Sequence, residues 1–210
     1  GDCTALPASV CSGAADSAND TTQTFTGSDI SIVTDPGFGL DVASGNAITS
    51  TSGTDGFSFD DANGSAITGN NYGLEIHNSS SGDIVVKSNG HITGTNWDAI
   101  EATNNAGTGD IIVEANDLDA GRRGVEAVNN GTGVIDIKVS GTINSGWDGI
   151  LASGGAASTG IKIDAYDINA GTHGIDISGN AGTGDVSVKA NNIDAVNNGI
   201  NVDTGPSTGN

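Results

Sequence analysis

A short apolar string, opened by a small residue, returns along the chain at an almost constant spacing. The residues that open it are Gly39, Gly56, Gly73, Ala99, Gly124, Gly149, Gly174 and Gly199. The first two intervals are 17 residues, and the later ones are 26, 25, 25, 25 and 25 residues. A fixed period of this kind is typical of repeat architectures, in which each unit buries its apolar face only against its neighbours. The spacing predicts two short coils followed by long coils of about 25 residues.

Each long coil contains three strings that alternate apolar and polar residues. In successive coils the second string reads DIVVKS, DIIVEA, VIDIKV, GIKIDA and DVSVKA, and the third reads HITG, DLDA, TINS, DINA and NIDA. Such alternation is typical of strands with one buried face. Strands that recur at a fixed period stack as parallel sheets, whose crossovers are right-handed. The predicted fold class is therefore all-β: a right-handed, single-stranded parallel β-helix with three strands per coil.

The segment 1–38 lies outside this repeat, which covers residues 39–210. It contains both cysteines, Cys3 and Cys11, and no zinc-binding spacing surrounds them. Two cysteines this close together predict one disulfide loop and an oxidising compartment. Because a terminal unit must shield the open end of a repeat core, we interpret 1–38 as an N-terminal cap braced by that disulfide. The turn-like string GPSTGN at the end of the chain indicates a repeat domain truncated at its C-terminus.

The chain is strongly acidic, with a net charge of −20 and only six basic residues. This balance excludes nucleic acid as a partner, because phosphate recognition needs basic patches. No apolar run approaches the roughly 20 residues that a membrane helix needs. We therefore expect no direct membrane insertion by this chain.

One outward column of the predicted stack alternates in charge at every step. It consists of Lys87, Glu114, Lys138, Asp164 and Lys189. Residues in one column of a parallel stack lie about 4.8 Å apart, so opposite charges attract and like charges repel. A register shifted by one residue would lose the alternation. The column therefore supports the register of the long coils and predicts a structural ladder between them.

The corner before each apolar string is the most polar part of the repeat. Two residues before the string stand Trp97, Arg122 and Trp147, and one residue before it stand Asp98, Arg123 and Asp148. We expect Arg122 to stack between the two indoles as a cation–π contact. We expect Arg123 to lie between the two aspartates, as a second ladder between coils.

Two other interpretations of this corner remain open. Asp98, Arg123, Asp148 and His173 could form a catalytic group, because paired acids perform general acid–base chemistry on glycosidic bonds. The two indoles could form a platform for a carbohydrate. The alternation of charge favours the structural ladder, and so do the short corners, which leave little to enclose a sugar. We therefore predict no catalytic residue.

Glu75, Glu101 and Glu126 form a column of three like charges in the predicted register. Stacked carboxylates about 5 Å apart repel each other or share a cation such as Ca²⁺. Side chains that splay into solvent would relieve the same repulsion without a metal ion. We therefore keep a weak Ca²⁺ site as an alternative and predict no other metal or cofactor.

The strings GTGDIIVEA, GTGDVSVKA, GIDIS and GINVD, with the cysteine loop ahead of the first coil, resemble the passenger domain of a bacterial autotransporter over residues 39–210. The resemblance implies type V secretion: export to the periplasm, translocation by a C-terminal outer-membrane barrel outside this chain, and display on the cell surface or release. It implies the role of a virulence-associated adhesin.

For function, we expect a non-enzymatic passenger fragment that acts in adhesion, self-association or host interaction through a rigid rod. Its partner would be a host surface molecule, a glycan or another copy of the chain. The alternative is a polysaccharide-active enzyme on the same fold, either pectate lyase-like or a glycosidase. Such enzymes carry long loops at one corner, whereas this repeat has an almost constant coil length.

Overall fold

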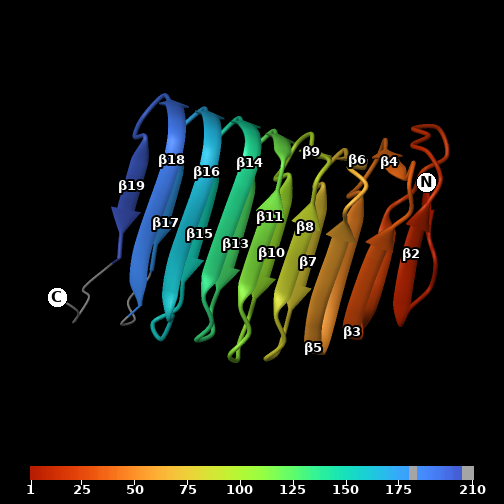
Figure 1. The fold of residues 1–210 in the computed structure, drawn as a ribbon, viewed down its shortest axis with the longest axis horizontal. Coiled ribbons are helices and arrows are strands. Elements are labelled where there is room, and N and C mark those ends of the chain that lie inside the picture. The colour runs from red at the N-terminus through yellow and green to blue at the C-terminus, as the bar shows by residue number, and fades with distance from the viewer. Residues whose placement is uncertain (180–183, 205–210) are drawn as a thin grey trace.

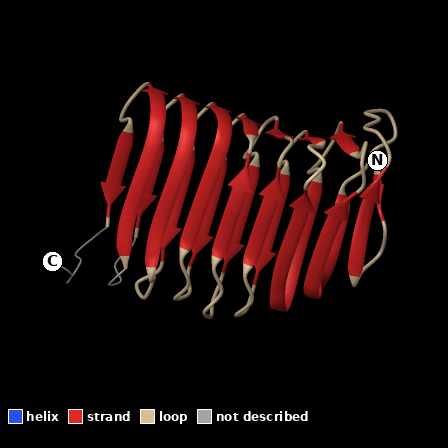
Figure 2. Ribbon diagram, viewed as in Figure 1, coloured by secondary structure: helices blue, strands red, loops and turns tan. Residues whose placement is uncertain are grey.

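The structure, a computed structural model, describes residues 1–179 and 184–204, and these form strands joined by turns with no helix (Figures 1 and 2). The strands stack into one elongated body, with β2 and β19 near its opposite ends (Figure 1). No described segment is a helix long and apolar enough to cross a membrane. In chain order the strands are β1 (Asp2–Cys3), β2 (Ala8–Ser12), β3 (Gln23–Thr34), β4 (Gly39–Val42), β5 (Ile48–Asp61), β6 (Ala66–Gly69), β7 (Leu74–Asn78), β8 (Ile84–Ser88), β9 (His91–Gly94), β10 (Ile100–Asn104), β11 (Ile111–Ala115), β12 (Asp117–Ala120), β13 (Val125–Asn129), β14 (Ile135–Ser145), β15 (Ile150–Gly154), β16 (Gly160–Ala170), β17 (Ile175–Ser178), β18 (Asp185–Ala195) and β19 (Ile200–Asp203).

Successive coils pair in parallel, one directly against the next. The first-string positions that stack are Gln23, Ile48, Leu74, Ile100, Val125, Ile150, Ile175 and Ile200. Consecutive members of this column are 25 or 26 residues apart. The structure thus confirms an all-β parallel β-solenoid with coils of about 25 residues. Its right-handed winding stays a prediction.

The number of separate strands in a coil varies along the stack. The coils β7–β9 and β10–β12 have three strands each, as predicted. In the later coils the second and third strings form one longer strand, as in β14, β16 and β18. The bend between the two strings remains as a register irregularity between Val139 and Thr142.

Columns of aliphatic side chains fill the interior. Ile92, Leu118, Ile143 and Ile168 pair directly with one another and are fully buried. Burial of each such side chain stabilises the fold by about 1.5–3 kcal/mol. A Cβ placed on Gly149 would meet the Ile168 side chain and lie 2.5 Å from the carbonyl oxygen of the next coil. Close approach between coils therefore explains why a small residue opens each one.

The two short coils predicted over residues 39–73 are wrong. Leu40 pairs with Ile67 in the third-string stack, and Phe57 pairs with Ile84 in the second-string stack. Leu74, which follows the opening residue Gly73, belongs to the first-string stack. The 17-residue spacing is therefore a step around one coil and not a step between coils. A glycine followed by an apolar residue marks more than one corner of these coils, so this pattern alone cannot tell the corners apart.

The predicted boundary at residue 38 is also corrected, because the stack continues on its N-terminal side. Strand β3 pairs in parallel with β5, and β2 pairs in parallel with β3. Strand β1 departs from this pattern and pairs antiparallel with β2. Cys3 lies opposite Cys11 in that pairing and forms the predicted disulfide with it. The capping role predicted for the N-terminal segment 1–38 stays a prediction.

Candidate functional site

A cluster of charged and aromatic side chains lies at the corner where the third string of one coil leads into the first string of the next. It contains every arginine of the chain. The interactions below join its members across neighbouring coils. We define the charged corner as Trp97, Asp98, Glu101, Arg122, Arg123, Glu126, Asp148 and His173.

Asp98 is the buried centre of this corner, with a side chain that is 0% exposed. Arg122 holds it with two contacts, from Nε to Oδ1 at 2.7 Å and from Nη2 to Oδ2 at 2.5 Å. The backbone N–H of Arg123 also donates to Oδ1, at 2.9 Å. Charge-assisted, bidentate contacts of this kind fix both geometry and charge. Asp98 is therefore a rung between coils, as the sequence predicts, and it is fully enclosed.

The guanidinium of Arg122 lies close to both indoles, as the register predicts. Its Cζ is 5.1 Å from the ring centroid of Trp97 and 6.0 Å from that of Trp147. Tyr72 stacks on Trp97 with ring centroids 6.0 Å apart. Trp97 and Trp147 nevertheless remain 42% and 51% exposed, so the carbohydrate platform stays a prediction.

Arg123 lies between two carboxylates, but they are not the predicted pair. Its Nη1 is 2.6 Å from Glu126, and its Nε is 3.2 Å from Asp148. We expected the Arg123 guanidinium to contact Asp98, but the Arg122 guanidinium makes that contact instead. The reason is that Arg122 precedes Arg123 at the same corner and already uses both oxygens of Asp98.

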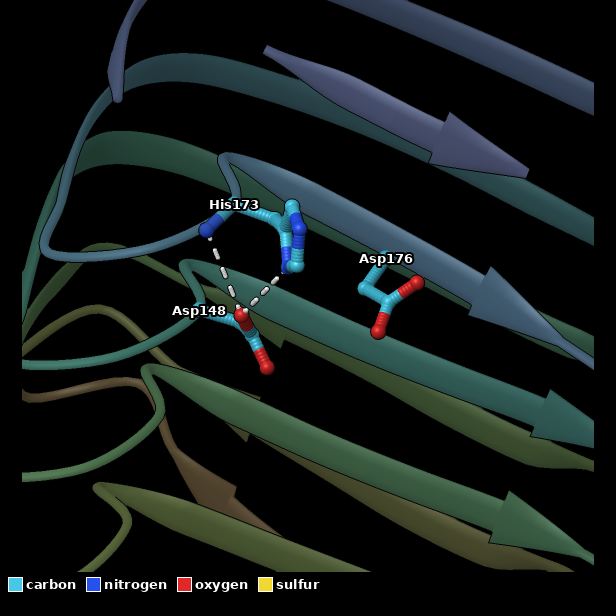
Figure 3. A group of neighbouring side chains, drawn as sticks. All are labelled: Asp148, His173 and Asp176. Atoms are coloured by element: carbon cyan, nitrogen blue, oxygen red, sulfur yellow. Dashed lines mark hydrogen bonds and ion pairs between the residues drawn. The ribbon is translucent and has the colours of Figure 1, made fainter. Parts of the chain in front are cut away.

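Asp148 faces His173 and Asp176 on the next coil (Figure 3). Its Oδ1 accepts hydrogen bonds from the backbone N–H of His173 at 3.3 Å and from the Thr172 hydroxyl, and lies 3.1 Å from Nδ1 of His173. Its Oδ2 accepts from Arg123. One donor atom from each of Asp148, His173 and Asp176 lies within 4.8 Å of the others, a spacing that a metal ion could bridge. The hydrogen bonds already made by Asp148 satisfy both of its oxygens.

The three glutamates stack in the predicted column, and each has partners. Glu75 accepts hydrogen bonds from Asn46 and Thr49, at 2.6 and 3.3 Å. His77 lies 3.7 Å from Glu75 and 3.9 Å from Glu101. Glu126 contacts both arginines. These neighbours relieve the repulsion in the column, and a shared Ca²⁺ remains an untested prediction.

The acids of the corner differ in pKa because their surroundings differ. Burial raises the pKa of Glu101 and of Glu126 above the ordinary 4.5. Burial also works to raise the pKa of Asp148, but hydrogen bonds from Thr172, Arg123 and His173 outweigh it, so that pKa lies below the ordinary 3.8. The pKa values of Glu101 and Glu126 therefore lie above their ordinary value, whereas the pKa of Asp148 lies below its own.

We predict that thermal stability rises when the pH is lowered from 7 toward 5. Because Glu101 and Glu126 have raised pKa values, the folded state binds protons more readily there than the unfolded state, which favours folding at lower pH. Below about pH 4 the lowered pKa of Asp148 reverses the trend. Melting temperatures measured across pH 3–8 check this, and Glu101→Gln should reduce the rise. A melting temperature that falls steadily from pH 7 to 5 would contradict the prediction.

The outward charge column has the predicted register, and Asp60 extends its alternation by one step. Ion pairs form between Lys87 and Glu114 at 3.5 Å and between Asp164 and Lys189 at 3.1 Å. Among the described residues Lys138 forms no ion pair within 4.0 Å, since each neighbouring acid pairs with the lysine on its other side. These pairs are exposed and contribute at most about 1 kcal/mol each.

A buried asparagine ladder was missed by the sequence reasoning. Asn78, Asn104 and Asn129 are fully buried and stack in one column. Asn78 donates to Asn104 at 3.3 Å, and Asn104 and Asn129 both donate to the carbonyl of Gly109, at 2.9 and 3.0 Å. Their amides thus satisfy turn carbonyls that would otherwise lack partners. The signal was an Asn at the end of the first string in three successive coils, which resembles an ordinary turn residue.

A second missed feature is an open groove along the third-string face. Its wall is an outward column of Thr93, Asp119, Asn144, Asn169 and Asp194, one residue from each coil. In each coil a small residue follows, so little stands above the backbone there. The hollow has a volume of about 690 Å³. We call it the amide groove.

The fold and these two surfaces together define a β-solenoid protein with an internally paired charged corner and an open groove. Comparisons of the chain with family models, curated proteins and solved structures found no match. They therefore assign no family to the chain.

Proposed function

We propose that the chain is a non-enzymatic binding rod, displayed on a bacterial surface or secreted, that acts in adhesion, self-association or host interaction. The observation that carries the proposal is the constant coil length: first strings recur every 25 or 26 residues from Gln23 to Ile200. From Gln23 onward the turns between the described strands are short, so no long loop walls off a cleft there. A catalytic cleft needs such walls to enclose a substrate.

The partners and the separations of the acidic side chains also favour binding over catalysis. In the charged corner Asp98 is held by Arg122, and Asp148 is held by Arg123 and His173. In the amide groove, Asp119 and Asp194 are three coils apart, which is about 14 Å at the usual strand spacing. Paired glycosidase acids lie roughly 5–9.5 Å apart. A pectate lyase-like or glycosidase activity is therefore the less favoured function.

Export is supported by two features. The Cys3–Cys11 disulfide is typical of oxidising compartments outside the cytosol. The repeat strings resemble autotransporter passengers, which are displayed or released at the cell surface. We accordingly place the chain at the cell surface or outside the cell, as part of a passenger-like rod.

The test is to immobilise the chain on beads and to measure their retention on epithelial cells and on beads that carry the same chain. Retention without turnover is expected. In parallel, a panel of neutral and acidic polysaccharides is assayed for reducing ends and unsaturated products. Turnover that is lost in Asp148→Ala would overturn the non-enzymatic proposal, and beads retained on neither surface would overturn the binding role.

A further inference from the structure

We propose that the amide groove binds an extended, uncharged glycan chain that runs along the axis of the rod. This inference rests on the proposed binding function and assigns that function a surface and a ligand class. The groove crosses the third-string positions of five successive coils, on β9, β12, β14, β16 and β18.

The chemistry of the wall fits hydroxyl groups. The Asn169 amide donates to Asn144 at 2.9 Å, and the Asn144 amide donates to Asp119 at 2.8 Å. Both asparagine side chains are exposed, and each amide has further donor and acceptor capacity. A sugar hydroxyl both donates and accepts, so it can use that capacity. The ladder also holds the amides in place before a ligand arrives, which lowers the entropy cost of binding.

The spacing of the wall fits a linear polymer. One polar side chain is presented by each coil, about every 4.8 Å along the axis. A ligand that contacts several of these side chains must extend along the axis of the rod. The small residues Gly94, Ala120 and Ala170 beside the wall leave room for the flat face of a sugar ring to approach the backbone.

The charge of the groove selects an uncharged ligand. Its lining contains no lysine or arginine, and its two acids are Asp119 and Asp194. An acidic polysaccharide would be repelled by them and by the net charge of −20. Within the lining, the neutral Asn144 and Asn169 separate these two carboxylates, so a basic peptide would find few partners there. Asp119 is also 2.9 Å from His91, which reduces its attraction for a cation.

The other long polar face is less suited to such a ligand. Its column of Lys87, Glu114, Lys138, Asp164 and Lys189 pairs charges across coils. A neutral chain placed there would have to compete with these ion pairs. The same face therefore supplies matched control positions for the groove.

The experiment is calorimetric titration of the whole chain with hexasaccharides. The uncharged probes are cellohexaose, chitohexaose, mannohexaose and maltohexaose, and hexagalacturonate and hexalysine are the charged probes. We expect at least one uncharged hexasaccharide to bind, with an affinity that exceeds its disaccharide's at least tenfold and that is unchanged between 50 and 500 mM NaCl. The double variant Asn144→Ala/Asn169→Ala should weaken binding at least tenfold, while Lys162→Ala on the other face should not change it.

Three results would overturn the groove assignment: no uncharged probe binds, only a charged probe binds, or the double variant binds as the wild type does. Circular dichroism confirms that each variant keeps its strands before titration. The assay on cells separates this failure from that of the binding role. If wild-type beads are retained and the double variant is retained equally, the binding role stands and the groove assignment fails.

Discussion

Replacing Arg122 with alanine is expected to lower the free energy of unfolding by about 3–5 kcal/mol, because removal of one partner of a buried ion pair leaves an uncompensated charge. The charge left behind is Asp98, whose side chain is 0% exposed and receives two contacts from the guanidinium. The variant also removes the cation from between Trp97 and Trp147. Urea denaturation followed by circular dichroism measures the change.

Two further variants make this prediction specific. Lys162→Ala removes an exposed ion pair with Asp136 and should cost at most about 1 kcal/mol. Arg122→Leu combined with Asp98→Asn removes the buried charges together and should recover part of the loss. If Arg122→Ala costs no more than Lys162→Ala, the buried corner does not fasten the coils.

Replacing Phe59 with alanine is expected to lower the free energy of unfolding by about 3–5 kcal/mol, the usual effect of truncating a buried aromatic side chain. Phe59 is fully buried in β5, between Ile32 of β3 and Val86 of β8. It therefore joins the coil that begins at Gln23 to the later coils. The loss should appear in the main unfolding transition, measured by urea denaturation.

The matched control for Phe59 is its neighbour Ser58, which faces the other side of the same strand. Ser58→Ala is expected to change the free energy of unfolding by less than about 0.5 kcal/mol, as surface substitutions do. A Phe59→Ala loss confined to a separate early transition would indicate that the N-terminal coils fold independently. That result would contradict a continuous core.

The long coils could be predicted from the sequence because two independent patterns agree there. The aliphatic columns require an inward face, and the alternation from Lys87 to Lys189 requires the same register on the outward face. In the first third of the chain, the spacing of the opening glycines was the single pattern behind the prediction. The charge of Asp60 against Lys87 would have identified the true coil length, since it continues the alternation at the correct spacing.

The tryptophans, arginines and aspartates of the charged corner could be predicted, but their pairing could not, and Glu126, which contacts both arginines, was assigned to a separate column. Trp97, Arg122 and Trp147 occupy the same position in successive coils. Because a constant coil length stacks such positions on one another, Arg122 lies beside both indoles. The choice of Arg122 rather than Arg123 for Asp98 depends on the turn of the backbone at the corner, which a repeat alignment does not contain. Burial of Asp98 was equally hidden, since a charged residue at a corner is usually solvated.

The residues of the amide groove follow a regular pattern in the sequence, but we did not predict a groove from it. The third residue of the third string is Thr, Asp, Asn, Asn and Asp in successive coils, and it is followed by Gly or another small residue. Each string alone resembles an ordinary polar strand face. The groove becomes apparent only when the coils are stacked and the small residues align beside the polar column.

Disulfide trapping tests the unbroken stack most directly, because the rod-like function depends on it. Asp60 and Lys87 are exposed neighbours on adjacent coils, whereas a 17-residue coil would place Asp60 beside His77. The double variant Asp60→Cys/Lys87→Cys should form a cross-link under mild oxidation, and Asp60→Cys/His77→Cys should not, as mapped by mass spectrometry of proteolytic fragments. Cross-linking of the second pair without the first would contradict the continuous stack of 25- and 26-residue coils.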